Sequence, residues 1–314
     1  MRRASRSAAA GAVAPGAPGR ANRLFSNAFL LQLERLAFVS RRTHVGRVKG
    51  ERKSPRRGSS VEFADYRPYE IGDDLRYVDW NAFARLNRLY LKVFMDEEDL
   101  CVHLVMDGSA SMDFGDDGGP TKFRYGVRLA AALAFVGFSN LERVGVAVFR
   151  DRVSEGWLPT RGRNQFLPVE DFLTGLVPAG PTRFNDSLRQ YAMRAKDAGL
   201  AVVISDFLDP AGFEDGLRAL MERRFDVHVI HVLARDELRP SFGGDLELVD
   251  AETGEVREVS IDGEALRGYQ ARLQGYLDGV EGFCRSNEIN YVRVTTDVGL
   301  EDLLLRRLKG SLLQ

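Results

Sequence analysis

Short apolar runs alternate with longer amphipathic segments through most of the chain beyond residue 100. The runs have the length and composition of strands buried on both faces of a sheet, and the longer segments carry apolar residues at helical spacing. The expected strands are 101–106, 144–149, 200–204, 226–233 and 291–294. The expected helices are 121–139, 164–176, one from about 185, 212–224, 264–287 and 300–308. This alternation predicts an α/β fold, a doubly wound and mostly parallel sheet with helices on both faces.

The first part of the chain lacks this alternation. We expect a disordered tail over 1–21, a smaller N-terminal segment over 22–96, and the sheet domain over 97–314 with a hairpin insertion near 242–260. Within the N-terminal segment, residues 22–40 have apolar positions at helical spacing. Such a helix either docks on a partner or membrane surface or packs on its own domain, and we favour packing.

Residues 60–96 combine many aromatic residues with acidic and basic side chains close together in sequence. Three interpretations are open: catalytic carboxylates, an ion-pair network around buried Tyr and Trp rings, or an interaction surface. We favour the network, because the Arg guanidinium group is well shaped for pairing with carboxylates. The acids concerned are Asp73, Asp74 and Asp79, and their expected partners are Arg67, Arg76 and Arg85.

Charge and composition narrow the class of protein. The net charge of −1 hides an asymmetry, because residues 1–60 contain 14 Lys or Arg but only two acids, Glu34 and Glu51. A basic run at 47–58 has no interleaved aromatic residues, so we favour a solvated loop over nucleic-acid binding. The chain has only two cysteines, Cys101 and Cys284, which cannot make a disulfide framework. This usage fits a protein of the reducing cytoplasm. The sequence contains no run of 18 apolar residues, so we expect no membrane-spanning helix. Peripheral contact with a membrane stays open.

The strongest chemical signal follows the first expected sheet strand. Asp107, Ser109 and Ser111 come directly after the apolar run 101–106, and Asp206 follows the run 200–204. Ligands in such sheets bind beyond the carboxyl ends of the strands, where these side chains are expected. A carboxylate and two hydroxyls are hard oxygen ligands that suit Mg²⁺, with Mn²⁺ or Ca²⁺ possible.

These residues resemble a known pattern. The Asp107-x-Ser109-x-Ser111 loop, Thr182 before a helix and Asp206 after another strand are similar to the metal-ion-dependent adhesion site of von Willebrand factor A (vWA) domains. The match extends to the DUF58 family of prokaryotic vWA-like proteins. There, a segment like Tyr66-Arg67-Pro68-Tyr69, Gly72-Asp73-Asp74-Leu75-Arg76 and Asp79-Trp80 precedes the vWA domain. The resemblance spans about 58–308.

The resemblance implies metal ligands and partners. Ser109 and Ser111 would be direct hydroxyl ligands, Asp107 and Asp206 would act partly through water, and Thr182 would complete the set. The implied function is a non-enzymatic, metal-dependent protein-interaction module that binds an acidic residue of another protein. DUF58 proteins are similar to the partners of MoxR-type AAA+ ATPases, which are thought to mature or assemble other proteins. The chain contains no phosphate-binding loop motif, so ATP hydrolysis would belong to that partner.

Two alternatives stay open. The first is a metal-assisted hydrolase or phosphotransferase that uses Asp107, although no Gly-x-Ser-x-Gly elbow is present and Ser109 stands where a second carboxylate would be needed. The second is an Asp-Ser-Ser turn that caps the next helix and binds nothing. His103, His228 and His231 lie on expected strands and are expected to be packed rather than catalytic.

Overall fold

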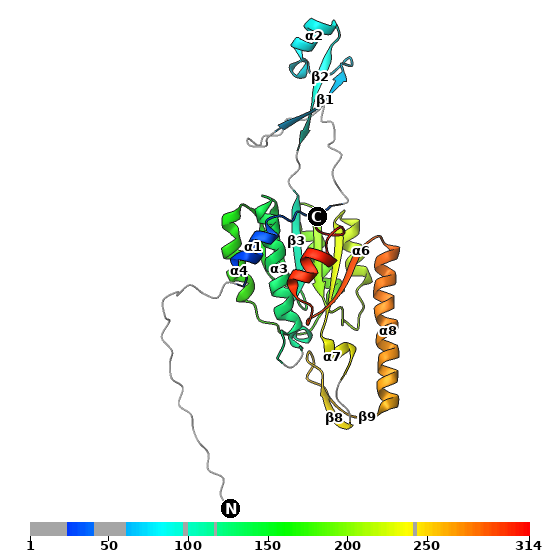
Figure 1. Cartoon of the computed structure of the whole chain (residues 1–314). Coiled ribbons are helices and arrows are strands. Elements are labelled where there is room, and N and C mark those ends of the chain that lie inside the picture. Colours follow the sequence, from blue (N-terminus) through cyan, green and yellow to red (C-terminus); the bar gives the residue numbers. More distant parts are fainter. Residues whose placement is uncertain (1–23, 41–60, 97–99, 116–117, 241–243) are drawn as a thin grey trace, which may run out of the picture.

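The computed structural model describes residues 24–40, 61–96, 100–115, 118–240 and 244–314 (Figure 1). The expected tail at 1–21 and the basic run at 47–58 lie outside the described residues. In the segments 61–65 and 92–96 the backbone is described but side-chain burial is not.

A six-stranded sheet forms the centre of the molecule. The strands in sheet order are β10 (Asn290–Thr295), β7 (Asp226–Leu233), β6 (Leu200–Ser205), β3 (Cys101–Asp107), β4 (Arg143–Phe149) and β5 (Val153–Arg161). All neighbours pair in parallel except β4 and β5, which are antiparallel. The predicted α/β architecture is therefore confirmed. The edge strand β5 was missed because most of its residues are exposed, so it has no apolar run to signal it.

Helices cover both faces of this sheet (Figure 1). Alternate residues of β3 point to opposite faces, so Leu104 and Met106 join one core cluster and Val105 joins the other. The first cluster is covered by α1 (Asn27–Leu33), α3 (Lys122–Ser139) and α4 (Phe166–Thr174). The second is covered by α5 (Phe184–Arg194), α6 (Glu214–Glu222) and α8 (Gly263–Ser286).

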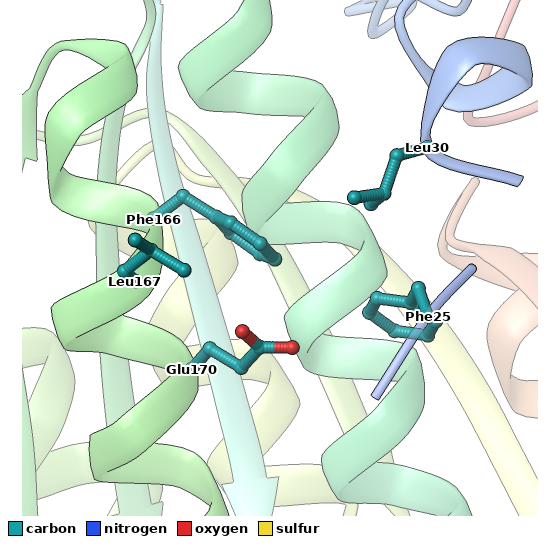
Figure 2. Close-up of a pocket in the computed structure, with 5 residues that line it drawn as sticks. All are labelled: Phe25, Leu30, Phe166, Leu167 and Glu170. Carbon is teal, nitrogen blue, oxygen red and sulfur yellow. The ribbon is translucent and has the colours of Figure 1, made fainter. Parts of the chain in front are cut away.

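The segment around α1 packs on the sheet domain, as we favoured. Its helix is shorter than expected, but Phe25, Phe29 and Leu33 are buried in the core cluster that contains α3. Figure 2 shows a small pocket where α1 meets α4. The pocket is lined by Phe25, Leu30, Phe166, Leu167 and Glu170. At its edge the Leu24 amide donates a hydrogen bond of 3.1 Å to Glu170 Oε1. The apolar residues of this segment therefore pack against the chain's own sheet domain.

Residues 61–96 form a separate small sheet. Strands β1 (Val61–Pro68) and β2 (Tyr90–Asp96) pair antiparallel, and between them lie a 3₁₀ turn (Leu75–Tyr77) and α2 (Trp80–Leu86). Figure 1 draws this unit beyond the end of the main sheet.

The expected ion-pair network exists only in part. Arg67 pairs with Asp73 at 2.7 Å, and Arg76 pairs with Asp74. Asp79 instead caps α2 and accepts a hydrogen bond from Tyr66. The expectation of buried rings was wrong: Trp80 is 58% exposed, because a two-stranded hairpin with one short helix is too small to enclose it.

The remaining elements complete the second half of the chain. After α7 (Arg235–Leu238), strands β8 (Gly244–Val249) and β9 (Val256–Ile261) form the expected hairpin. The expected final helix is a short α9 (Leu300–Asp302) followed by a π-helical turn (Leu303–Arg307). Two 3₁₀ turns, Ala110–Asp113 and Arg163–Gln165, lie in loops. Within the described ranges, no helix combines the length and apolarity that crossing a membrane requires.

Candidate metal centre

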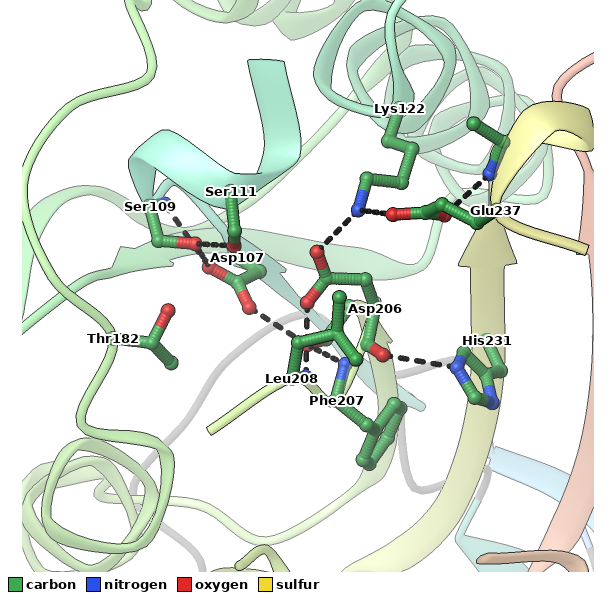
Figure 3. Close-up of polar contacts among 12 residues, drawn as sticks. Asp107, Ser109, Ser111, Lys122, Thr182, Asp206, Phe207, Leu208, His231 and Glu237 are labelled. Atoms are coloured by element: carbon green, nitrogen blue, oxygen red, sulfur yellow. Dashed lines mark hydrogen bonds and ion pairs between the residues drawn. The ribbon is translucent and has the colours of Figure 1, made fainter. Parts of the chain in front are cut away.

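Asp107 is the last residue of β3, and the loop after it turns back toward its carboxylate (Figure 3). The Ser109 amide and hydroxyl donate to Asp107 Oδ1 at 3.0 and 2.7 Å. The Ser109 and Ser111 hydroxyl oxygens are 3.0 Å apart. On the other side, the Ser205 hydroxyl donates to Asp107 Oδ2 at 2.7 Å. The structure thus brings the carboxylate and the two predicted hydroxyl ligands together.

The position of this site follows from the strand order. The chain leaves β3 toward β4 and β5 on one side, while β6, β7 and β10 lie on the other. The carboxyl ends of β3 and β6 are therefore adjacent at the point where the strand order reverses, which is where doubly wound sheets bind ligands.

Gly108 lets the loop pass very close to β4. Its amide donates to the Phe149 carbonyl at 2.8 Å, and its own carbonyl accepts from Arg150 Nε at 3.0 Å. A Cβ atom at this position would lie 2.6 Å from Val148 Cγ1, closer than packed atoms allow. Glycine is therefore required between Asp107 and Ser109 for steric reasons.

A second loop, which carries Thr182, is bonded to the first. The Ala110 amide donates to the Gly180 carbonyl and the Ala179 amide to the Gly108 carbonyl, each at 2.9 Å. Thr182 is buried, but its contacts are with Glu252 rather than with the serines. Its amide and hydroxyl donate to the two oxygens of the Glu252 carboxylate at 2.8 and 2.7 Å.

The start of α5, just after Thr182, is capped from outside the helix. The residue at the cap position is Arg183, whose side chain forms no capping hydrogen bond. Asp209 Oδ2 accepts the hydrogen bond of the Phe184 amide at 2.7 Å. Because the cap comes from a distant loop, the local sequence could not indicate it.

Asp206 pairs with a buried lysine (Figure 3). Lys122 Nζ lies 2.6 Å from Asp206 Oδ2 and 2.5 Å from Glu237 Oε1. The remaining oxygen of Asp206 accepts from the Leu208 amide at 3.1 Å. Sequence reasoning missed both Lys122 and Glu237. One signal was available: a lysine in the first turn of a helix stands against the positive end of the helix dipole, so a special partner is needed there.

The electrostatics of the centre are dominated by burial. Burial, followed by the nearby Asp206 charge, raises the pKa of Asp107 to about 7, although hydrogen bonds from Ser205 and Ser109 oppose the shift. Burial also works against the charge on Lys122, but the two carboxylates beside it outweigh that effect and raise its pKa. The Lys122 ammonium group therefore contacts two carboxylates, those of Asp206 and Glu237, while Asp107 lies close enough to Asp206 to feel its charge.

The three strand histidines are buried, as expected. Burial lowers the pKa of both His103 and His231 to about 4, so both are neutral at pH 7. His231 bonds to the Asp206 carbonyl through Nε2 and to the Tyr291 hydroxyl through Nδ1, at 2.9 Å each. His103 and His231 are therefore neutral hydrogen-bonding groups of the core, bonded to Tyr191 and to Tyr291 and Asp206 respectively.

Three oxygen atoms of the site are placed where they could bind a hard divalent cation: the Ser109 and Ser111 hydroxyls and Asp107 Oδ1. Adjacent ligands of an octahedral Mg²⁺, each about 2.1 Å from the ion, are roughly 3.0 Å apart, which matches the Ser109 and Ser111 oxygens. Asp107 Oδ1 adjoins the same pair. Thr182 and Asp206 flank this group but are bonded to Glu252 and Lys122. Among the described residues, no three His, Cys, Asp or Glu side chains are grouped so that they could hold a metal, so such a site would depend on the hydroxyls.

Comparison with known proteins identifies the family. A family model described as "Protein of unknown function DUF58" matches residues 65–274. The chain belongs to the DUF58 family. This DUF58 protein is 33% identical over 236 residues to the uncharacterized protein Rv1480 of Mycobacterium tuberculosis, a match that covers 73% of the chain and 70% of the relative. The uncharacterized protein Mb1516 of Mycobacterium bovis matches equally well.

Similar solved structures share little sequence with the DUF58 chain. The conserved hypothetical protein BatB from Bacteroides thetaiotaomicron is 18% identical, with a TM-score of 0.41, and the match covers 63% of this chain and 91% of BatB. The SpRpn10 VWA domain is 16% identical, with a TM-score of 0.35, and the match covers 66% of this chain and 94% of that domain.

Proposed function

We propose that this DUF58 protein is a non-enzymatic protein-interaction module whose binding depends on a divalent cation. Mg²⁺ is the proposed ion, with Mn²⁺ or Ca²⁺ as substitutes. Asp107, Ser109, Ser111, Thr182 and Asp206 would hold it at the carboxyl end of the sheet. When bound, the cation supplies positive charge at a position that an Asp or Glu of another protein can occupy.

The observation that carries this proposal is the pair of serine hydroxyls beside Asp107. Ser109 and Ser111 place two oxygens 3.0 Å apart, next to a carboxylate that is wholly buried. Both hydroxyls are neutral ligands, so a divalent ion held by them keeps most of its charge for an incoming acidic group. The excess of carboxylates over ammonium groups around Asp206 also favours a cation.

The partner proposed for this module is a MoxR-type AAA+ ATPase, with which it would mature or assemble other proteins in the cytoplasm. This part of the proposal rests on membership of the DUF58 family and on the sequence pattern. The chain carries no phosphate-binding loop motif, so ATP hydrolysis is assigned to the partner.

Calorimetric titration with Mg²⁺ and Mn²⁺ tests the metal site. Saturable binding is expected for the wild type and for Ser187→Ala, a buried serine whose hydroxyl bonds to the Arg150 carbonyl instead. Binding is expected to be lost in the double variant Ser109→Ala/Ser111→Ala. A pull-down of the ATPase with and without EDTA tests the partner. Wild type that binds neither ion would overturn the proposal and leave the loop as a structural turn.

A search for catalysis separates this function from the hydrolase alternative. Phosphatase and esterase substrates are incubated with the Mg²⁺-loaded wild type and with Asp107→Asn. We expect no turnover by either protein. Turnover that disappears in Asp107→Asn would replace the interaction module by an enzyme that uses Asp107.

A further inference from the structure

The β8–β9 hairpin brings a carboxylate to the edge of the candidate metal centre. Glu252, in the turn of this hairpin, accepts hydrogen bonds from both the amide and the hydroxyl of Thr182, 70 residues earlier in the chain. The Thr182 loop is itself bonded through Gly180 to the loop that holds Ser109 and Ser111. An acidic side chain of the protein's own therefore reaches one of the five predicted metal-site residues.

The turn is built to present this side chain. Asp250 Oδ1 accepts from the Glu252 and Thr253 amides at 2.9 and 2.8 Å. Gly254 adopts a φ of +71°, and its amide donates to the Asp250 carbonyl at 2.9 Å. The hydrogen bonds from the Thr253 and Glu252 amides lower the pKa of Asp250, so it stays ionised and holds the turn. The backbone at Glu252 is thus fixed within the turn by the Asp250 carboxylate.

The hairpin has little core packing of its own. Val249 is 63% exposed and Val256 is 55% exposed, although they are paired at the end of the hairpin next to the turn. Segments with few buried apolar contacts open at low free-energy cost. The Glu252 contact with Thr182 can therefore form and break without disturbing the sheet.

Charge points to the role of this contact. Within the described part of the chain, neither Asp107 nor Glu252 forms an ion pair, whereas Asp206 is compensated by Lys122. Building on the proposed function, we propose that Glu252 is an internal acidic ligand of the centre. It occupies the position that an acidic residue of a partner must take, so the partner has to displace the hairpin turn. The site is then closed by the protein's own chain until a competing carboxylate arrives.

Mn²⁺ provides a direct probe, because bound Mn²⁺ accelerates the relaxation of water protons according to the number of exchanging waters it holds. The full-length wild type is compared with Glu252→Ala and with Glu247→Ala, which removes an exposed glutamate from the same hairpin. We expect Glu252→Ala to bind Mn²⁺ about tenfold more weakly, because the centre loses an acidic ligand. We also expect its bound Mn²⁺ to relax water faster than in the other two proteins.

A second measurement tests displacement. Acetate, the simplest carboxylate, is titrated into the three Mn²⁺-loaded proteins while water relaxation is followed. Acetate should reduce water relaxation in Glu252→Ala at concentrations that leave the wild type and Glu247→Ala unchanged. Only in Glu252→Ala is the ligand position that Glu252 fills open to another carboxylate.

The outcomes separate this inference from the proposed function. If the wild type binds Mn²⁺ but Glu252→Ala matches Glu247→Ala in affinity, relaxation and acetate response, Glu252 merely anchors a loop and the inference is wrong. If the wild type shows no Mn²⁺ binding that depends on Ser109 and Ser111, the proposed function itself fails. Circular dichroism of each variant establishes that the sheet domain is folded.

Discussion

Lys122 Nζ lies 2.6 Å from Asp206 Oδ2, and both side chains are buried where α3 begins. A second carboxylate, that of Glu237, binds the same ammonium group at 2.5 Å. Asp206 is therefore already neutralised by an internal cation, while Asp107 on the neighbouring strand is not. The two aspartates of the candidate centre therefore differ: Asp206 already has an internal cation beside one of its oxygens, whereas Asp107 is bonded only to hydroxyl and amide groups.

Replacing Lys122 by methionine should reveal the strength of this pairing. The variant leaves the buried Asp206 and the partly buried Glu237 without their cation, and losing one partner of a buried ion pair typically costs about 3–5 kcal/mol of the free energy of unfolding. Urea denaturation measures the loss, and Lys309→Met, at an exposed lysine, serves as the control. We further expect Mg²⁺ to restore part of the stability of Lys122→Met. A variant as stable as the control would show that the pair contributes nothing.

Substituting Gly108 by alanine should damage the centre sterically. The added methyl group would overlap Val148, which forces a backbone shift that costs about 1–3 kcal/mol. Mn²⁺ affinity should fall together with thermal stability, because Ser109 moves with the loop. Gly275→Ala is the matched control: nothing lies within 4 Å of that Cβ position in α8, so the helix should become more stable. Unchanged Mn²⁺ binding in Gly108→Ala would contradict this account of the loop.

Acid should destabilise the fold through His103. The unfolded histidine takes up a proton near pH 6.5, whereas the folded one does so only near its pKa of about 4. Between these values the unfolded state binds more protons, so this residue lowers stability as pH falls, by about 3 kcal/mol in total.

The double variant His103→Phe/Tyr191→Phe tests this pH dependence. It removes the titrating ring together with the tyrosine hydroxyl that bonds to it at 2.7 Å, so that hydroxyl is not left buried without a partner. The stability of the wild type, relative to the variant, should decrease from pH 6.5 to pH 4. Parallel stability curves for the two proteins across that range would refute the assignment to His103.

The small sheet of residues 61–96 carries apolar side chains on its surface. Ile71 is 102% exposed and Trp80 is 58% exposed, whereas Val78 is only 6% exposed. We expect Ile71→Ser and Trp80→Ser to change stability by less than about 0.5 kcal/mol, and Val78→Ala to cost about 1–2 kcal/mol. Chemical denaturation measures all three. A large loss in Ile71→Ser would indicate that this surface is packed rather than open.

Much of the architecture could be predicted because it depends on buried apolar periodicity. The interior strands and α3 fall close to their expected bounds, since each must bury a continuous run or a stripe in the core. The Asp107 loop was also predictable, because its residues are neighbours in sequence and lie at a strand end. Edge strand β5 has no such constraint and was missed.

The partners of the site residues could not be read from local patterns. Lys122 is paired with residues 84 and 115 positions away, and Thr182 with one 70 positions away. Such contacts arise only when loops from different strands meet at one edge of the sheet. The exposure of Trp80 was misjudged for a related reason, because an aromatic-rich sequence indicates burial only where enough structure surrounds it.

Pairing between residues near the two ends of the described chain has an architectural consequence. Ala37 and Gln314 exchange backbone hydrogen bonds of 3.2 and 2.9 Å, and Phe25 and Leu33 share a core with α3. The sheet domain thus draws on residues both before and after the 61–96 hairpin. Topologically the hairpin is an insertion, so evolution or a protein engineer can exchange it for another module while the sequence of the sheet domain stays the same.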